Sequence, residues 1–221
     1  MDGEHSGIDF ADVKLFLRAA ESVGVPVIIR LNRPDDITAL NELGVAGFQF
    51  PHVQNAEQAR MYVERVKYAP VGWRGFASTL RAQKYDMTKF EDYYKFANEE
   101  TLLLVQIEEK QGIENMEEII AVEGVDVIVT GKGDISQSQG VIGDVFNPKV
   151  DAVKNRIMEV AAKYNKPTLV VGKDREDWIN LVKNKNVAIA EYIQDIDLLL
   201  NGAIQARKDA EYLKDARQGK I

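Results

Sequence analysis

The feature that most constrains the fold is a regular alternation of short apolar runs with longer amphipathic segments. The apolar runs are rich in valine, isoleucine and leucine, which is typical of strands buried in a parallel sheet. Strands that alternate with helices indicate repeated βα units, so the pattern predicts a parallel sheet covered by helices. The predicted strands are residues 25–31, 46–50, 102–107, 125–129, 167–171 and 187–193, and the predicted helices are residues 10–23, 34–43, 55–67, 113–122, 150–164 and 175–183.

Two segments depart from this alternation. Residues 68–98 contain Pro70, glycines, arginines and a cluster of tyrosines, and they predict a long loop followed by a short helix. Loops of this length inside a compact domain are usually functional. Residues 195–217 predict a long Lys/Asp-rich helix that packs either on the body of the chain or on another subunit. The whole chain, residues 1–221, fits one α/β domain.

Two carboxylates stand at the ends of neighbouring predicted strands. Glu108 ends the run that begins at Thr101, and Asp134 follows the run that begins at Val125. Because neighbouring parallel strands deliver their carboxyl ends to one place, the two carboxylates are expected to converge. Oxygen ligands of this kind suit Mg²⁺ or Mn²⁺. The alternative for either residue alone is a cap on the following helix.

Composition excludes several classes of function. There are 28 basic and 35 acidic side chains and no basic stripe, so a nucleic-acid partner is not expected. The absence of cysteine excludes disulfides, thiolate zinc sites and a cysteine nucleophile. No apolar run approaches the roughly 20 residues of a membrane span, and a cytoplasmic protein is expected.

Seven short motifs follow one another in order between residues 2 and 136. They are Asp2-Gly-Glu-His5, Val27-Ile-Ile-Arg30, Phe50-Pro-His-Val-Gln-Asn-Ala-Glu57, Tyr68-Ala-Pro-Val-Gly-Trp-Arg-Gly75, Gln106-Ile-Glu108, Val122-Glu-Gly-Val-Asp126 and Gly131-Lys-Gly-Asp-Ile-Ser136. With these motifs the chain resembles the metal-dependent (class II) pyruvate aldolases of the 2,4-dihydroxyhept-2-ene-1,7-dioate aldolase family, and the resemblance runs over nearly the whole chain.

The resemblance implies a (β/α)₈ TIM barrel. The six predicted strands and a short piece at the amino terminus make about seven, whereas a closed barrel has eight. The missing part corresponds to the first strand, the first helix and the body of the second strand. We therefore expect the start of the chain to be truncated relative to the family and the barrel to be open there.

The resemblance also implies the activity. It is a divalent-metal-dependent aldolase that cleaves 4-hydroxy-2-oxo acids to pyruvate and an aldehyde through a metal-bound pyruvate enolate. The implied metal ligands are Glu108 and Asp134, holding Mg²⁺ or Mn²⁺ with Co²⁺ as an alternative. Two other functions stay open: a synthase of the same fold that uses another oxoacid, as a citrate synthase does, and a non-catalytic paralogue that binds an oxoacid.

For the substrate, the resemblance implies a second set of residues. Gln106 is expected to bind a metal-held water, and the backbone around Gly131, Lys132 and Gly133 is expected to receive the substrate carboxylate; these glycines could equally form an ordinary tight turn. Lys132 stands where the family usually has proline, so it either adds a cation near the metal or faces solvent. Arg74 either contacts an acidic tail of the substrate or makes a structural salt bridge.

The implied catalytic residues are Arg30, His5 and Glu42. Arg30 is expected to support the enolate oxygen as a fixed cation. His5 is expected to be the general base, with His52 as its competitor, since these are the two histidines of the chain. Glu42 aligns with an aspartate that partners the histidine in the family. The resemblance further implies a homo-oligomer, a hexamer in which the last helix is exchanged between neighbours.

Overall fold

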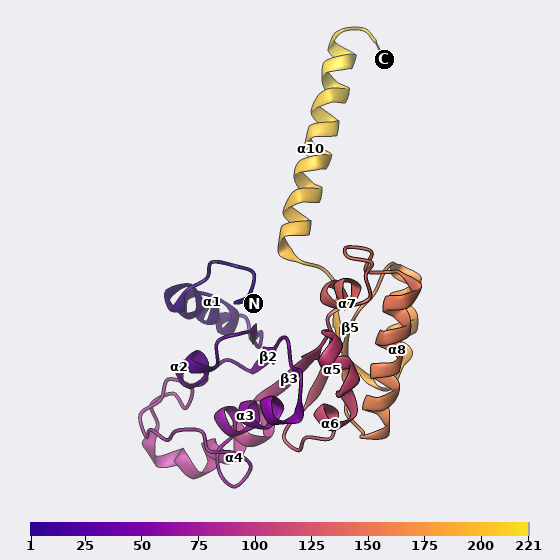
Figure 1. Ribbon diagram of the computed structural model, residues 1–221. Coiled ribbons are helices and arrows are strands. Elements are labelled where there is room, and N and C mark those ends of the chain that lie inside the picture. Colours follow the sequence, from indigo (N-terminus) through magenta and orange to yellow (C-terminus); the bar gives the residue numbers. More distant parts are fainter. Residues whose placement is uncertain (221) are drawn as a thin grey trace.

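The computed structural model describes residues 1–220 as a six-stranded parallel sheet with helices around it (Figure 1). Neighbouring strands along the chain are also neighbours in the sheet, in the order β1 to β6. Such an order is typical of βα units wound in one direction. The strands are β1 (Ile28–Arg30), β2 (Gly47–Phe50), β3 (Leu102–Ile107), β4 (Val127–Thr130), β5 (Thr168–Val171) and β6 (Val187–Glu191). All six predicted strands are therefore present, most of them shorter than predicted.

The first residues of the chain extend the sheet beyond β1. The Met1 amine donates to the Ile28 carbonyl over 2.8 Å, and the amide N–H groups of Arg30 and Gly3 donate to the carbonyls of Met1 and Arg30, each over 2.9 Å. Asp2 and Arg30 thus pair in parallel as an isolated bridge. This pairing brings the segment from Asp2 to His5 to the carboxyl edge of the sheet, where a site is expected.

The two faces of the sheet bury different apolar clusters. The outward face packs against the helices and includes Val27, Phe48 and Leu103. The inward face has its own cluster around Leu104 and Val129, on which Ile28 of β1 and Ile189 of β6 also pack. Residues from both edge strands meet one cluster, so the sheet curls toward its inward face. The described residues form six strands, however, and an eight-stranded closed barrel is not observed among them.

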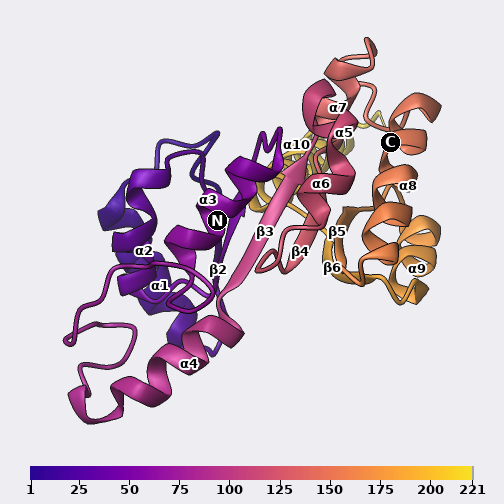
Figure 2. The same cartoon turned by 60° about the horizontal axis from the view of Figure 1, so that its bottom comes forward.

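Helices connect the strands and cover the outward face (Figure 2). Several begin at side-chain caps, which satisfy free N–H groups of the first turn: Asp9 forms a capping box with Asp12, and Asn55, Asn147 and Asp174 cap later helices. The helices are α1 (Phe10–Ser22), α2 (Ile37–Leu43), α3 (Ala56–Val66), α4 (Phe90–Glu100), α5 (Lys110–Glu114), α6 (Met116–Ile120), α7 (Lys132–Ser138), α8 (Pro148–Lys163), α9 (Arg175–Lys183) and α10 (Asp195–Arg217), with short 3₁₀ helices at Pro34–Asp36 and Met87–Lys89.

Three connections differ from the prediction in detail. The single helix predicted over residues 113–122 is two short helices, because Asn115 leaves helical geometry and its side-chain amide donates to the Gln54 carbonyl over 2.9 Å. The seven-residue helix α7 was not predicted. Residues 34–36 form a 3₁₀ turn before α2. The predicted loop followed by a short helix is confirmed, with α4 as that helix.

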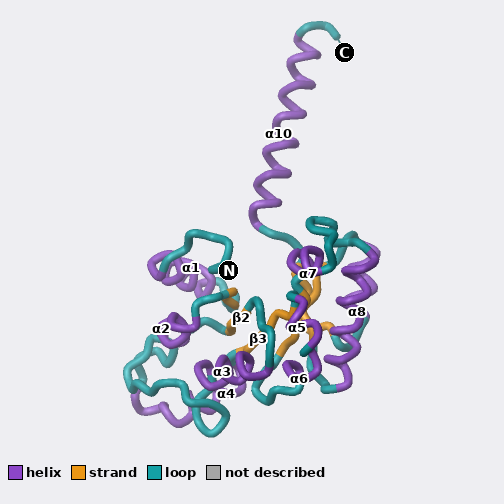
Figure 3. The backbone as a smooth tube through the Cα atoms, viewed as in Figure 1, coloured by secondary structure: helices purple, strands orange, loops and turns teal. Residues whose placement is uncertain are grey.

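The last helix stands apart from the sheet. Helix α10 projects away from the body as a single rod (Figures 1 and 3) and has no buried residue. Its exposed side chains include Ile196, Leu199 and Leu213. Among residues 1–220, no helix is both long and apolar enough to cross a membrane.

Candidate active site

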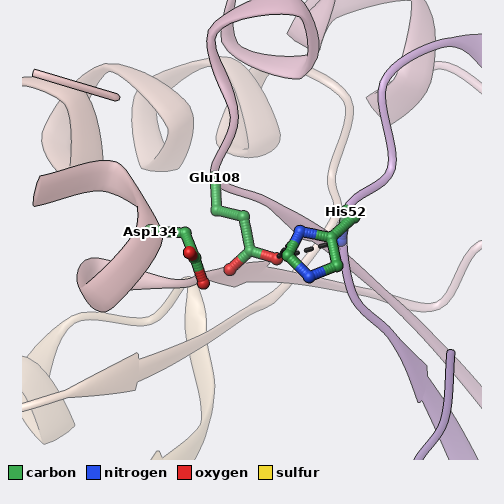
Figure 4. A group of neighbouring side chains, drawn as sticks. All are labelled: His52, Glu108 and Asp134. Atoms are coloured by element: carbon green, nitrogen blue, oxygen red, sulfur yellow. Dashed lines mark hydrogen bonds and ion pairs between the residues drawn. The ribbon is translucent and has the colours of Figure 1, made fainter. Parts of the chain in front are cut away.

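Three potential metal ligands converge at the carboxyl edge of the sheet. Glu108 directly follows β3, Asp134 lies in the first turn of α7 after β4, and His52 follows β2. One ligand atom of each lies within 4.8 Å of the others (Figure 4). Within residues 1–220, this is the one group of three or more His or acidic side chains close enough to hold a metal ion. The predicted convergence of Glu108 and Asp134 is therefore observed, and a histidine joins them.

Glu108 is completely buried at the centre of this group. One carboxylate oxygen accepts the backbone N–H of His52 over 2.9 Å, and the other accepts the side-chain amide of Gln106. Burial raises the pKa of the Glu108 carboxyl, and the bonds from Gln106 and His52 oppose that rise. A carboxylate in such a position is held in one orientation while its charge still needs a cation.

Gly131 leaves the space that Glu108 occupies. A Cβ atom on Gly131 would lie 1.8 Å from Glu108 Oε2 and 2.6 Å from the Gln106 amide nitrogen. No real side chain can be that close, so residue 131 has to be glycine for Glu108 to keep this position. By contrast, a Cβ on Gly133 would meet nothing within 4 Å, so the turn is open on that side.

His52 is surrounded by carboxylates from two segments of the chain. Its Nε2 lies 2.8 Å from Glu4 Oε1, while its Nδ1 lies 3.3 Å from Glu108 Oε1 and 3.0 Å from Glu109 Oε1. Burial lowers the pKa of His52, but the charges of Glu108, Glu4 and Glu109 outweigh it and the pKa is raised. The residue has a φ of 57°, in the left-handed region that few side chains other than Asn, Asp and His adopt.

A row of polar side chains crosses the strands beside these groups. Arg30, Gln49 and Gln106 come from β1, β2 and β3, and the Gln49 amide donates to Gln106 Oε1 over 2.5 Å. Gln106 in turn donates to Glu108. The two amides therefore form a chain of hydrogen bonds to the buried carboxylate, and Arg30 is the register partner of Gln49 in the sheet.

Arg30 is fixed by two acidic residues of the first segment. Its guanidinium donates to both oxygens of Asp2, over 2.9 and 2.6 Å, and its Nε lies 3.4 Å from Glu4 Oε2. The bond from Arg30 lowers the pKa of Asp2 to about 2. A bidentate pair of this kind fixes the plane of the guanidinium. Arg30 thus stands where it was predicted, at the carboxyl edge.

His5 lies at the rim of the same group. Its side chain is 61% exposed, and its Nε2 lies 3.5 Å from Glu4 Oε2. Glu4 therefore lies between His5 and His52, because its other oxygen contacts His52. The structure thus brings both histidines to one buried carboxylate, with His52 on the inner side.

Two predicted site residues lie at the opposite edge of the sheet. Arg74 stacks its guanidinium on the Tyr68 ring, 4.5 Å from the ring centre. Its backbone N–H donates to the Lys67 carbonyl. The Lys67 ammonium in turn donates to the carbonyl of Thr101, just before β3 begins. Glu42 lies in the last turn of α2, accepts the Ala82 N–H over 3.1 Å and is close enough to influence the pKa of Tyr68. Neither side chain lies beside Glu108 within this chain. Glu42 is at the end of α2 and Arg74 comes after α3, and both helices run from the carboxyl edge of the sheet back toward the amino ends of the strands.

The Lys132 side chain also turns away from the three ligands. Its Nζ lies 4.3 Å from the centre of the Phe146 ring and 3.7 Å from Asp151 Oδ1. The ammonium is buried and, within residues 1–220, has no hydrogen-bond partner. Lys132 was predicted either to add a cation near the metal or to face solvent. The structure shows neither, because the side chain lies between α7 and α8.

Sequence reasoning did not single out Glu4, Gln49 and Glu109. Glu4 was included only as part of the motif Asp2-Gly-Glu-His5. Gln49 had a signal, since it is the one polar residue in the strand Gly47–Phe50 and alternation places it on the face opposite its phenylalanine neighbours. Together with the predicted residues, these side chains form an open, acidic, oxygen-rich and nitrogen-containing site suited to a divalent cation and an anionic substrate.

The family model described as HpcH/HpaI aldolase/citrate lyase matches residues 1–180. The 2-dehydro-3,6-dideoxy-6-sulfogluconate aldolase of Pseudomonas putida is 34% identical over 205 residues, which are 92% of this chain and 79% of that protein. The 5-keto-4-deoxy-D-glucarate aldolase of Escherichia coli (strain K12) is 32% identical over 179 residues, 80% of this chain and 69% of that protein.

Solved structures share the fold. An HpcH/HpaI aldolase from Desulfitobacterium hafniense DCB-2 superposes with a TM-score of 0.87 at 24% identity, covering 95% of this chain and 82% of that one. The citrate synthase SbnG superposes with a TM-score of 0.83 at 26% identity, covering all of this chain and 84% of that one. The six-stranded sheet is thus the same architecture as in these larger proteins.

Proposed function

The chain belongs to the HpcH/HpaI aldolase/citrate lyase family and is a metal-dependent aldolase, a carbon–carbon lyase, and we propose that it cleaves 4-hydroxy-2-oxo acids to pyruvate and an aldehyde. The observation that carries the proposal is the convergence of Glu108 and Asp134 from the ends of two neighbouring strands. We further propose that the curled sheet is part of a (β/α)₈ barrel, because active sites in that fold lie at the carboxyl ends of the strands.

The residues at this edge fit a divalent cation. Glu108 and Asp134 would hold it, and Gly131, which has no Cβ, leaves the space that the Glu108 carboxylate occupies beside Asp134. Bound there, a divalent cation such as Mg²⁺, Mn²⁺ or Co²⁺ supplies a Lewis acid that stabilises negative charge on the keto oxygen of the substrate. The buried Glu108 charge fits this assignment, since a buried carboxylate requires a compensating positive charge.

The remaining residues bind and orient the oxoacid. Arg30, held rigidly by Asp2 and Glu4, presents a fixed positive charge to the oxygen on which the enolate develops. The Gln106 amide donates to Glu108 and thereby orients the carboxylate of this ligand. The backbone N–H groups of Gly131, Lys132 and Gly133 lie at the start of α7, and the turn is open at Gly133, so they can receive the substrate carboxylate.

His5 is proposed as the general base. Its exposed imidazole, next to the buried Glu4, can take the proton of the 4-hydroxyl group while the bond between C3 and C4 breaks. The electron pair of that bond remains on C3 as the pyruvate enolate, and the aldehyde leaves. Return of the proton to C3 completes pyruvate, so no proton is gained or lost overall.

The exposed apolar side chains of α10 support an oligomer. Leu199, Leu200 and Leu213 are more than half exposed on a helix that has no buried residue. We propose that α10 packs on a neighbouring subunit, as in the hexamer that the family resemblance implies. A mass measurement in solution tests this, and a monomer at micromolar concentration would contradict it.

The test of the function is exchange of the pyruvate methyl protons with D₂O, followed by proton NMR with added Mg²⁺ or Mn²⁺ and with EDTA as the control. Exchange requires the enolate but no knowledge of the aldehyde. Rapid exchange that EDTA abolishes is the expected result. Metal-loaded, folded protein that leaves the methyl protons unexchanged would contradict a pyruvate-enolate site.

A second candidate reaction is condensation with another oxoacid. It is favoured by the likeness to SbnG, which covers the whole chain at 26% identity. The same NMR assay distinguishes the two reactions if a second oxoacid replaces the aldehyde as acceptor. A condensation product formed only with an oxoacid would favour the synthase, and aldehyde release from a 4-hydroxy-2-oxo acid would favour the aldolase.

A further inference from the structure

The two ring nitrogens of His52 face different partners. Nε2 lies 2.8 Å from Glu4 Oε1, a distance typical of a strong charge-assisted hydrogen bond. Nδ1 faces the metal ligands, 3.3 Å from Glu108 Oε1. It is buried and, in the part of the chain that the structure describes, makes no hydrogen bond of good geometry. The imidazole therefore presents Nε2 to the Glu4 carboxylate and Nδ1 to the side of Glu108 and Glu109.

Glu4 decides which nitrogen carries the proton. The Glu4 side chain is 4% exposed and also lies 3.4 Å from the Arg30 guanidinium, so its carboxylate is held from both sides. A carboxylate can only accept, and Nε2 must therefore donate its N–H to it. In the neutral imidazole this leaves the lone pair on Nδ1. Carboxylate–histidine–metal arrangements use this same division of roles.

The position of Nδ1 suits a shared cation. Two donors on adjacent positions of a first-row metal, each at about 2.1 Å, are about 3.0 Å apart. Nδ1 and Glu108 Oε1, at 3.3 Å, are close to that separation, and an atom of Asp134 lies within 4.8 Å of both ligand groups. The left-handed backbone of His52 also aims its N–H at the same Glu108 oxygen. Backbone strain of this kind is typical of functional sites.

We propose that His52 Nδ1 is a third ligand of the cation held by Glu108 and Asp134, and that Glu4 is the positioning residue that fixes its tautomer. A nitrogen donor shifts preference away from Mg²⁺ and toward Mn²⁺, Co²⁺ and Zn²⁺. The inference deepens the proposed function by naming the ligand set and the class of metal. It rests on the proposed metal site and makes no use of the aldol reaction.

Glu109 offers the alternative explanation. Its Oε1 lies 3.0 Å from Nδ1, so a doubly protonated His52 could bridge Glu109 and Glu4 without any metal. Gln54 also binds the Glu109 carboxylate, which is 37% exposed and can be solvated instead. The two explanations differ in whether a nitrogen enters the first coordination sphere, and spectroscopy of a bound paramagnetic ion distinguishes them.

The experiment uses Mn²⁺ and the full chain with ¹⁵N-labelled histidine. Pulsed electron paramagnetic resonance should detect coupling from one directly bound imidazole nitrogen in the wild type and lose it in His52→Gln. The Mn²⁺ dissociation constant should rise about 10–100-fold in His52→Gln and also in Glu4→Gln, where the tautomer is no longer fixed. Mg²⁺ binding should change far less. His5→Gln is the matched control, and its nitrogen coupling and Mn²⁺ affinity should equal those of the wild type.

Two results would overturn the inference. If Mn²⁺ binds, and Glu108→Gln abolishes its binding, but no histidine nitrogen couples to it, the metal site stands and His52 is not a ligand. If the folded protein, checked by circular dichroism, binds no Mn²⁺ at all, the metal site fails together with the inference. Exchange of pyruvate protons is measured separately, so failure of the aldolase reaction alone leaves the ligand assignment intact.

Discussion

Gly131 and Glu108 are in such close contact that a single methyl group at residue 131 would overlap the carboxylate, at 1.8 Å from Oε2. Gly131→Ala is therefore expected to displace Glu108 and to weaken binding of the divalent cation by at least about 100-fold. Titration calorimetry with Mn²⁺ measures this effect. Gly133→Ala is the control in the same turn, since its Cβ would meet nothing within 4 Å. Equal metal affinity in the two variants would contradict the close contact.

Glu108→Gln and Asp134→Asn should each abolish metal-dependent exchange of pyruvate protons. Each change keeps the shape of the side chain and removes the negative charge that holds the cation. Because Glu108 is buried and its pKa is raised by that burial, Glu108→Gln should leave the free energy of unfolding of the metal-free protein unchanged or higher. Urea unfolding in EDTA measures this. Normal exchange in either variant would show that the carboxylate is not a ligand.

The strands and the two carboxylates could be predicted because both follow from simple rules. Buried parallel strands are nearly continuous apolar runs, and all six appear where the runs are. Glu108 and Asp134 each come directly after such a run, and parallel strands place those ends together. The site therefore followed from strand direction without any knowledge of side-chain packing.

The remaining site depends on packing that a linear pattern does not contain. His5 and His52 both follow predicted strand ends, and only the left-handed backbone of His52 and the buried Glu4 decide which ring points inward. Lys132 is close to Asp134 in sequence, yet its ammonium contacts the Phe146 ring on the side of α7 that faces away from Glu108. Helix α7 itself is seven residues long, too short for apolar periodicity to reveal it.

The bond between Arg30 and Asp2 predicts a pH dependence of stability. It lowers the pKa of Asp2 from 3.8 to about 2, so the ionised carboxylate stabilises the folded state. That contribution is complete above pH 3.8, where Asp2 is ionised in the unfolded chain too, and it is lost as the pH falls toward 2. Asp2→Asn should therefore lower the free energy of unfolding at pH 6, and the difference from the wild type should shrink below pH 3.8. A difference that stays constant down to pH 3 would contradict the ion pair.

Lys132→Met should stabilise the protein. The ammonium is buried and has no hydrogen-bond partner among the residues that the structure describes, so its replacement by an apolar chain of similar length should raise the free energy of unfolding by about 1 kcal/mol. Lys154→Met is the control on the other side of Asp151: its ammonium lies 3.1 Å from that carboxylate, so its loss should lower stability. Pyruvate exchange should persist in Lys132→Met, because this side chain faces away from Glu108. A loss of exchange in Lys132→Met would contradict this prediction and show that the Lys132 side chain takes part in substrate binding.

Arg30 and Arg74 make a matched pair at opposite edges of the sheet. Both are at least partly buried, and both are held by specific partners, Arg30 by Asp2 and Arg74 by Tyr68 and Tyr93. Only Arg30 lies at the carboxyl edge, where it is the register partner of Gln49, the residue that begins the hydrogen bonds to Glu108. Arg30→Met should therefore reduce pyruvate exchange by about 100-fold or more, as loss of a fixed cation at a developing charge usually does.

Arg74→Met should lower the free energy of unfolding by about 1–3 kcal/mol, through loss of the stacked guanidinium, and leave exchange per folded molecule unchanged. Exchange measured at a temperature where both variants are folded separates these effects. If Arg74→Met instead lost exchange while staying folded, a site at the amino edge of the sheet, or one shared with a neighbouring subunit, would have to take part in the reaction.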